Sequence, residues 1–422
     1  MLRFSSSSSN KALFLTSLPL LALVLAACAT ESAESTANIA GADRIQSFDD
    51  PSGLLGTMSR KLVDNVSAAD IGQTFGVDDA FVPYPDTYWP MVDNGIDARW
   101  HDAGEASPLE KLVGMTNPAN LSKSKEWNRK NQGVDVPGVQ DWFGICHGWT
   151  GASITEHPVV RPVSAKLQGN RVVTCEAGSE GCTKFEIGDI NALLAQIYSD
   201  GNSKFVGARC DTSPANVEKD AFGRIVRRDN AQELGAGCKG VNPGSLLMIM
   251  NQRLRNDKKP MAINAQNDGN TDQIWNQPAY RYTVNRFEAL SESEAANLVA
   301  SGARTGTQSH YAWNDDARGF VFLDVTLSWV SENGPNVTYV SGLQSTRTTR
   351  MTAVIELDRA ATDAQAAIIG GEYVADAVAR TSRLKVQPFV WISTGPGRDG
   401  STGHNPYVKT SFVKQLAAFG QD

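Results

Sequence analysis

One cysteine lies in a sequence context that suits nucleophilic chemistry. Cys146 follows Gly144 within the run WFGICHGW (142–149), and the small residues after it are typical of the start of a buried helix. The free N–H groups and the dipole at a helix N-terminus favour the thiolate, which is the nucleophilic form of cysteine. A buried structural thiol is the alternative that these residues alone leave open.

A second informative run, IWNQPAYRYTV (274–284), lies far downstream of Cys146. With this run the chain resembles the transglutaminase elicitor family, whose oomycete members are cell-wall transglutaminases that carry a Val-Trp-Asn-Gln-Pro-Val elicitor peptide. The similarity extends from about residue 50 to about 395, with the motifs in the family's order. Four more stretches match: 188–194, 207–210, 241–244 and 368–373.

The resemblance implies an α+β fold with a papain-like cysteine enzyme core, in which a helical half precedes an antiparallel sheet half. It also implies that Cys146 is the nucleophile of a transglutaminase. In papain-like enzymes, a glutamine six residues before the cysteine donates to the oxyanion, and Gln140 has that offset. A solvated loop glutamine is the alternative reading of Gln140.

The general base is harder to place, because no histidine occurs between His157 and His310. The resemblance puts an acidic residue just before the Trp-Asn-Gln-Pro run, which makes Asp268 the candidate base and leaves Asn264 as the aligned alternative. A buried carboxylate can accept a thiol proton when burial raises its pKa. An Asx turn in a polar loop is the competing interpretation of Asp268.

Three further residues follow from the same alignment. Asn276 corresponds to the later amide of papain-like enzymes, while Trp275 and Pro278 are expected to line the substrate cleft. Plain packing is the alternative for Trp275. Among the histidines, His147 adjoins Cys146 on a helix and does not face it. His310 is the other candidate base, because it lies on or near a strand.

The first residues predict export. Arg3 and Lys11 precede an apolar stretch, 12–27, that is too short and wrongly flanked to span a membrane. The stretch ends in Leu-Ala-Ala before Cys28, which resembles a bacterial lipobox and predicts lipidation of Cys28. Ala29 resembles the signal for outer-membrane sorting. A plain secretory signal is the alternative.

The remaining cysteines predict disulfides in an oxidising compartment. They are Cys175, Cys182, Cys210 and Cys238. Three pairings are possible, and Cys175 with Cys182 is the natural local one, which leaves Cys210 with Cys238. No metal site is expected, because the cysteines lack paired two-residue spacing and no histidine lies among them.

The composition excludes some partners. A net charge of −7 argues against nucleic acid, since phosphate binding needs a cationic surface. Glutamine- and lysine-containing proteins or peptides are the expected substrates, the lipid anchor is the expected membrane contact, and thiol acyl transfer needs no cofactor.

Apolar patterning predicts the elements. We expect helices at 46–66, 187–198 and 243–255, with another beginning at Cys146. Strands are expected at 172–174, 261–264, 280–287, 319–330, 351–357 and 389–392, and a turn at 370–372. The expected organisation is a signal peptide (1–27), a lipidated tether (28–45), a loop-rich wrapping region (46–135), a catalytic domain (136–395) and a tail (396–422).

These features together predict a lipid-anchored protein-glutamine gamma-glutamyltransferase. Two other functions stay open: a cysteine peptidase or amidase that uses the same acyl-enzyme, and a catalytically silent lipoprotein that binds surface components.

Overall fold

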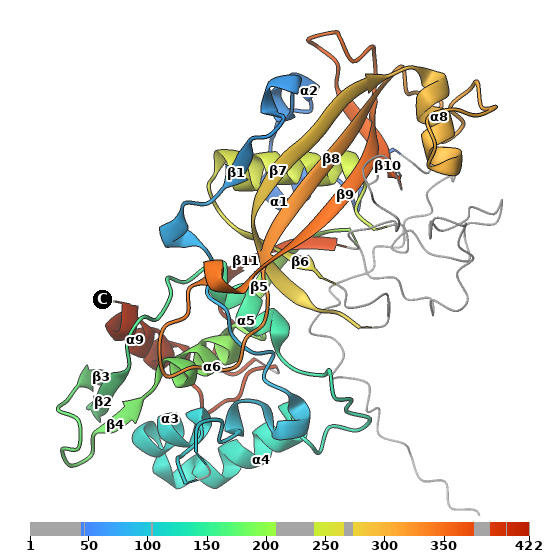
Figure 1. Ribbon diagram of the computed structural model, residues 1–422. Coiled ribbons are helices and arrows are strands. Elements are labelled where there is room, and N and C mark those ends of the chain that lie inside the picture. The colour runs from blue at the N-terminus through green and yellow to red at the C-terminus, as the bar shows by residue number, and fades with distance from the viewer. Residues whose placement is uncertain are drawn as a thin grey trace, which may run out of the picture. The chain divides into compact units, whose positions relative to one another are not determined.

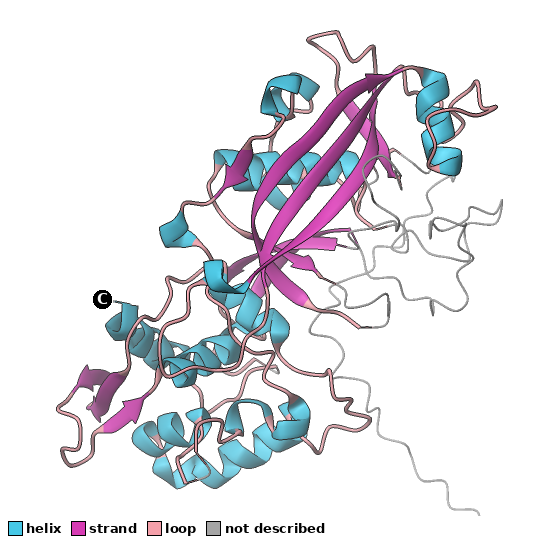
Figure 2. Cartoon of the chain, in the orientation of Figure 1, coloured by secondary structure: helices cyan, strands magenta, loops and turns pink. Residues whose placement is uncertain are grey.

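The computed structural model describes residues 44–45, 47–102, 104–207, 240–265, 273–374, 389–401 and 403–421. Its helices and strands form a helical region and a sheet region, which meet at the helix that begins with Cys146 (Figures 1 and 2). None of the described helices has the length and hydrophobicity needed to cross a membrane.

The helical region is built around α6 (Ile187–Tyr198), all of whose residues are buried. The buried residues include Asp189, Asn191 and Gln196 besides the apolar ones. Other helices and a small antiparallel sheet of order β3-β2-β4 surround this helix. These elements are α3 (Pro108–Thr116), α4 (Leu121–Gln132), α5 (Cys146–Ser153), α9 (Thr410–Gln421), β2 (Val163–Gln168), β3 (Arg171–Thr174) and β4 (Thr183–Phe185).

The sheet region is an antiparallel sheet of order β10-β9-β8-β7-β6-β11-β5, with β1 paired to β7 beside that path. Helix α7 (Pro243–Met250) lies in the same hydrophobic core as the inner side chains of this sheet. The strands are β1 (Thr74–Gly76), β5 (Asn202–Gly207), β6 (Met261–Asn264), β7 (Asn276–Leu290), β8 (Gly319–Val330), β9 (Thr346–Leu357), β10 (Ile368–Tyr373) and β11 (Phe389–Gly395).

Shorter elements complete the described part of the chain. A π-helical turn, η10 (Asn251–Asn256), continues α7. The other helices are α1 (Ser52–Leu55), α2 (Leu62–Asn65) and α8 (Glu292–Ser301). The 3-10 turns are η2 (Ala68–Asp70), η3 (Asp79–Phe81), η4 (Met91–Asp93), η5 (Gly95–Asp97), η6 (Pro118–Asn120) and η11 (Gly342–Ser345).

Most elements expected from patterning are present. The helix at 187–198 and the strand at 319–330 are confirmed with the same bounds, and the helix at Cys146 is confirmed as α5. The mixture of helices and antiparallel sheet is confirmed as well.

Four expectations differ from the structure. The single helix at 46–66 is instead the pair of short helices α1 and α2, and the loop-rich stretch 67–135 contains α3 and α4. The expected turn at 370–372 lies within strand β10. The expected tail, 396–422, includes α9, whose apolar side is buried in the helical region.

Candidate active site

Cys146 is the first residue of α5 and is buried, with 8% of its surface exposed. It keeps its thiol. Close packing sets the position of this helix: a Cβ on Gly148 would lie 2.2 Å from the carbonyl oxygen of Ala195 on α6. The small residues after the cysteine therefore bring α5 directly onto α6.

The turn before α5 is fixed by the segment that passes over it. The Ile145 N–H donates to the Tyr88 carbonyl at 2.7 Å, and the Met91 N–H donates to the Phe143 carbonyl at 2.8 Å. A Cβ on Gly144 would lie 2.2 Å from the Tyr88 carbonyl oxygen, so only glycine fits there.

Asn276, the first residue of β7, faces the thiol from the sheet region. Its Nδ2 donates to Cys146 Sγ at 3.5 Å, and its Oδ1 accepts a hydrogen bond from Trp391 Nε1 at 2.8 Å. The Thr150 hydroxyl on α5 donates to the Asn276 carbonyl at 2.8 Å. The indole donor fixes which end of the amide faces sulfur, so Asn276 presents an N–H to the Cys146 thiol.

The connection between β6 and β7 also approaches Cys146. The carbonyl oxygen of Ile274 lies 3.8 Å from Cys146 Sγ. The Trp275 N–H donates to Asn264 Oδ1 at 2.8 Å, and its ring meets the Tyr88 ring edge-on, with centroids 5.3 Å apart. Trp275 and Tyr88 thus lie together near the Cys146 thiol, one from each region.

The other expected site residues have different surroundings. Asn264 is buried at the end of β6, where its amide oxygen holds Trp275. Gln140 is exposed, and its Oε1 accepts from Trp142 Nε1 at 2.6 Å. Pro278 is buried within β7 opposite Ala262. Asp268 lies outside the described residues.

None of the five histidines is hydrogen-bonded to Cys146. His147 Nε2 lies 2.9 Å from the Ser199 carbonyl oxygen, and burial lowers the pKa of His147. His310 Nδ1 lies 2.6 Å from Glu292 Oε1 at the start of α8. The other three histidines also have partners elsewhere. His101 lies against Asp102 and Glu105, His157 against the Phe81 ring, and His404 against the Val408 carbonyl.

The disulfide between Cys175 and Cys182 is confirmed. Cys28, Cys210 and Cys238 lie outside the described residues.

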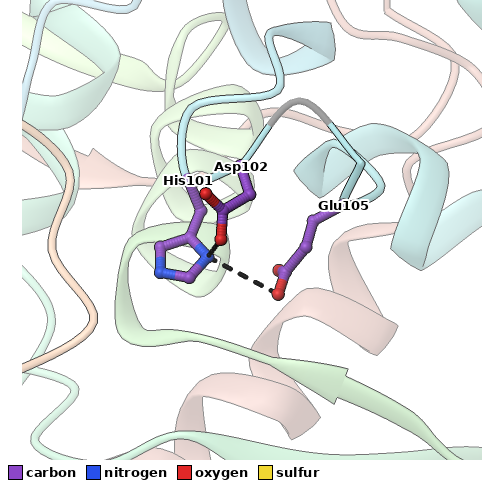
Figure 3. A group of neighbouring side chains, drawn as sticks. All are labelled: His101, Asp102 and Glu105. Carbon is purple, nitrogen blue, oxygen red and sulfur yellow. Dashed lines mark ion pairs between the residues drawn. The ribbon is translucent and has the colours of Figure 1, made fainter.

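One other group in the described part has metal-ligand side chains close together. His101 Nδ1 lies 3.5 Å from Asp102 Oδ2 and 3.5 Å from Glu105 Oε1 (Figure 3). All three side chains are exposed, and Lys111 Nζ lies 3.5 Å from Glu105 Oε2. These contacts are those of a surface ion-pair network.

Sequence reasoning missed two acidic residues near the site. Asp86 is fully buried and accepts from Trp89 Nε1 at 3.1 Å, and burial, with a smaller effect of Glu332, raises its pKa to about 8. Glu332 accepts from Gln277 Nε2 at 3.2 Å, and burial raises the pKa of Glu332 to about 7. Both residues lie in irregular segments, where no periodic pattern marks them.

Together, the fold and this site define a protein with a thiol at a helix N-terminus, facing an amide donor from an antiparallel sheet. The model of the family described as Transglutaminase elicitor matches residues 116–404, and the chain belongs to this family. No curated protein matches the chain.

Among solved structures, the chain is similar to the crystal structure of the GP42 transglutaminase from Phytophthora sojae. The TM-score is 0.58 at 18% sequence identity, over 86% of this chain and 95% of that one. At this identity the likeness shows a shared fold.

Proposed function

We propose that this protein is a thiol acyltransferase of the protein-glutamine gamma-glutamyltransferase type. The observation that carries the proposal is the pairing of Cys146, at the start of α5, with the Asn276 amide, which Trp391 holds in place. A donor 3.5 Å from sulfur stabilises a thiolate, as the helix N-terminus does. Membership of the transglutaminase elicitor family supports the same chemistry.

In the proposed reaction the Cys146 thiolate attacks the γ-carboxamide carbon of a glutamine side chain. The C–N bond breaks, the nitrogen takes a proton and leaves as ammonia, and a thioester remains on sulfur. A primary amine, such as that of lysine, then attacks the thioester carbon. The C–S bond breaks, the amine's proton passes to a base, and an isopeptide bond has formed.

The origin of the thiol and the amide in two different regions supports a papain-like core. The nucleophile comes from the helical region, and the amide comes from the sheet region on the residue after Trp275. In this proposal Asp268 takes the proton of the thiol, and Gln140 donates to the oxyanion.

Labelled-amine incorporation tests the function. Wild-type protein should attach a dansyl-labelled cadaverine to a glutamine-containing protein, and Cys146→Ala should lose this activity. Release of ammonia from the donor without amine attachment would favour an amidase or peptidase. Iodoacetamide labelling of Cys146 no faster than that of a free thiol would favour a silent binding protein.

We also propose that Cys28 is lipidated and anchors the protein to a bacterial outer membrane. The lipobox-like motif before Cys28 supports this. Bacterial lipoproteins carry three acyl chains, which are enough for stable attachment to a membrane. Cys28→Ala should leave the membrane fraction, and globomycin should leave the precursor uncleaved. Retention of the variant in the membrane would contradict the proposal.

A further inference from the structure

The surface beside the nucleophile is acidic. Tyr88, whose ring meets Trp275, is partly buried, and that burial together with the negative charges of Glu332, Asp93 and Asp141 raises the pKa of Tyr88. The Tyr88 hydroxyl itself donates to the Asp141 carbonyl at 2.9 Å. Three carboxyl groups are therefore close enough to act on the ring that flanks the site.

Glu332 is the member of this group tied most directly to the site. Its Oε1 accepts from the amide of Gln277, which follows Asn276 in β7. The next residue, Asn333, donates its N–H to the Asp86 carbonyl at 3.0 Å, which links the Glu332 segment to the chain that leads into Tyr88. Glu332 is half-buried, so solvent and ligands reach it.

The charge of this carboxylate is not balanced by the described part of the chain. No described lysine or arginine forms an ion pair with Glu332, Asp86, Asp93 or Asp141, whereas the buried Asp189 and Asp324 and the half-buried Glu110 have such partners. A carboxylate without a cation in a partly desolvated place is costly, and a cationic ligand removes that cost.

We propose that Glu332 is a specificity-determining residue that binds the acyl acceptor in its ammonium form beside Tyr88 and Trp275; the ammonium then gives its proton to water, and the neutral amine attacks the thioester on Cys146. The inference rests on the proposed acyl transfer and adds to it the charge class and a binding residue of the second substrate. The acidic surroundings disfavour anionic acceptors, since like charges repel at short range.

Titration of Glu332 makes the proposal dependent on pH. Burial raises its pKa to about 7, so the carboxylate is ionised at pH 8 and largely neutral at pH 6. The titratable groups that interact with Glu332 are Asp86 and Tyr88, and Tyr88 is also under the influence of Asp93 and Asp141. Asp86 has its pKa raised to about 8 by burial and thus carries only part of a charge across this range.

The test compares two acceptors, a dansyl-labelled cadaverine, whose free ammonium is cationic, and methoxyamine, which is uncharged at pH 6 and pH 8. The measured quantity is the ratio of kcat/KM for cadaverine to kcat/KM for methoxyamine. At pH 8 we expect Glu332→Gln to lower this ratio about tenfold, through KM for cadaverine. At pH 6 the wild type and the variant should differ much less. Glu126→Gln, at an exposed position on α4 where Glu126 pairs with Lys130, is the matched control and should keep the wild-type ratio.

The outcomes separate the two proposals. If the wild type transfers neither amine, the acyltransferase proposal fails and this inference fails with it. If both amines are transferred and Glu332→Gln keeps the wild-type ratio at pH 8, the inference is wrong while the transferase stands. If Glu332→Gln does not fold, the wild-type protein alone tests the inference. Its ratio of kcat/KM for cadaverine to kcat/KM for methoxyamine, corrected for the free-amine fraction, must fall from pH 8 to pH 6. A constant ratio overturns the inference.

Discussion

Replacing Asn276 with aspartate probes the contact between the sheet region and the nucleophile. Aspartate has the shape of asparagine, and its carboxylate can still accept from Trp391 Nε1, which now lies 2.8 Å from Asn276 Oδ1. What changes is the group 3.5 Å from Cys146 Sγ, where an N–H donor becomes a negative charge. The substitution therefore converts stabilisation of the thiolate into repulsion while keeping the packing.

The magnitude follows from the distance. Two unit charges 3.5 Å apart repel by about 5 kcal/mol at an effective dielectric constant of about 20. Each pKa unit corresponds to about 1.36 kcal/mol, so the repulsion alone corresponds to roughly three units. Protonation of the new carboxyl group relieves part of this, and we expect the pKa of the Cys146 thiol to rise by about two units.

The assay is the rate of alkylation of Cys146 by iodoacetamide as a function of pH, since only the thiolate reacts. The inflection should move upward by about two units in Asn276→Asp, and at pH values below both inflections the rate should fall by about 100-fold. Asn256→Asp, at an exposed position in η10, is the matched control and should keep the wild-type profile. An unchanged profile in Asn276→Asp, in protein with the wild-type melting temperature, would refute the assignment of Asn276 as a donor to sulfur.

Three further predictions follow from other parts of the chain. Burial raises the pKa of Asp86 to about 8, so between pH 4 and pH 8 the unfolded chain binds fewer protons than the folded one. The free energy of unfolding therefore falls as pH rises through this range. Asp86→Asn should remove this pH dependence in urea titrations and should raise the free energy of unfolding at pH 8 by up to about 5 kcal/mol. Asp268→Ala should lower amine incorporation by about 10²–10⁴-fold in folded protein, whereas His310→Ala should lose little activity. The reverse result would show that His310, from the sheet region, supplies the base. Replacing Cys175 and Cys182 by serine should lower the free energy of unfolding by about 2.5 kcal/mol, because their disulfide closes a short loop with a sequence separation of 7; an unchanged urea midpoint would contradict this.

The sequence predicts the start of helix α5 well because the relevant signals are local. Glycines and small residues around Cys146 indicate a tightly packed helix start, and α5 begins at that residue. The same holds for β8, whose apolar pattern alone defines its bounds. The bounds of a helix or strand that depend on residues nearby in the sequence can therefore be predicted from the apolar pattern.

Features that depend on distant contacts are not predictable in this way. The pair Gly370 and Gly371 suggests a turn, yet both residues lie in strand β10. A Cβ on Gly371 would lie 2.8 Å from the Val354 carbonyl oxygen on β9 and 3.3 Å from the backbone nitrogen of Gly244 on α7, so β9 excludes a side chain there and α7 adds to the crowding. Asp86 and Glu332 likewise become neighbours of the site only through tertiary contacts between loops.

The contacts of the histidines narrow the identity of the general base. Both imidazoles that sequence reasoning considered for this role have partners elsewhere, since His147 faces the Ser199 carbonyl and His310 faces Glu292. On the sheet side, Asn264 and Asn276 occupy the ends of β6 and β7, and an amide does not accept a proton at neutral pH. In the proposed reaction the thiol proton of Cys146 then passes to a carboxylate or to water, and a carboxylate is the stronger base of the two. Asp268 is therefore favoured over Asn264 as the base, and we expect a pH–rate profile for acyl transfer without the inflection of an imidazole.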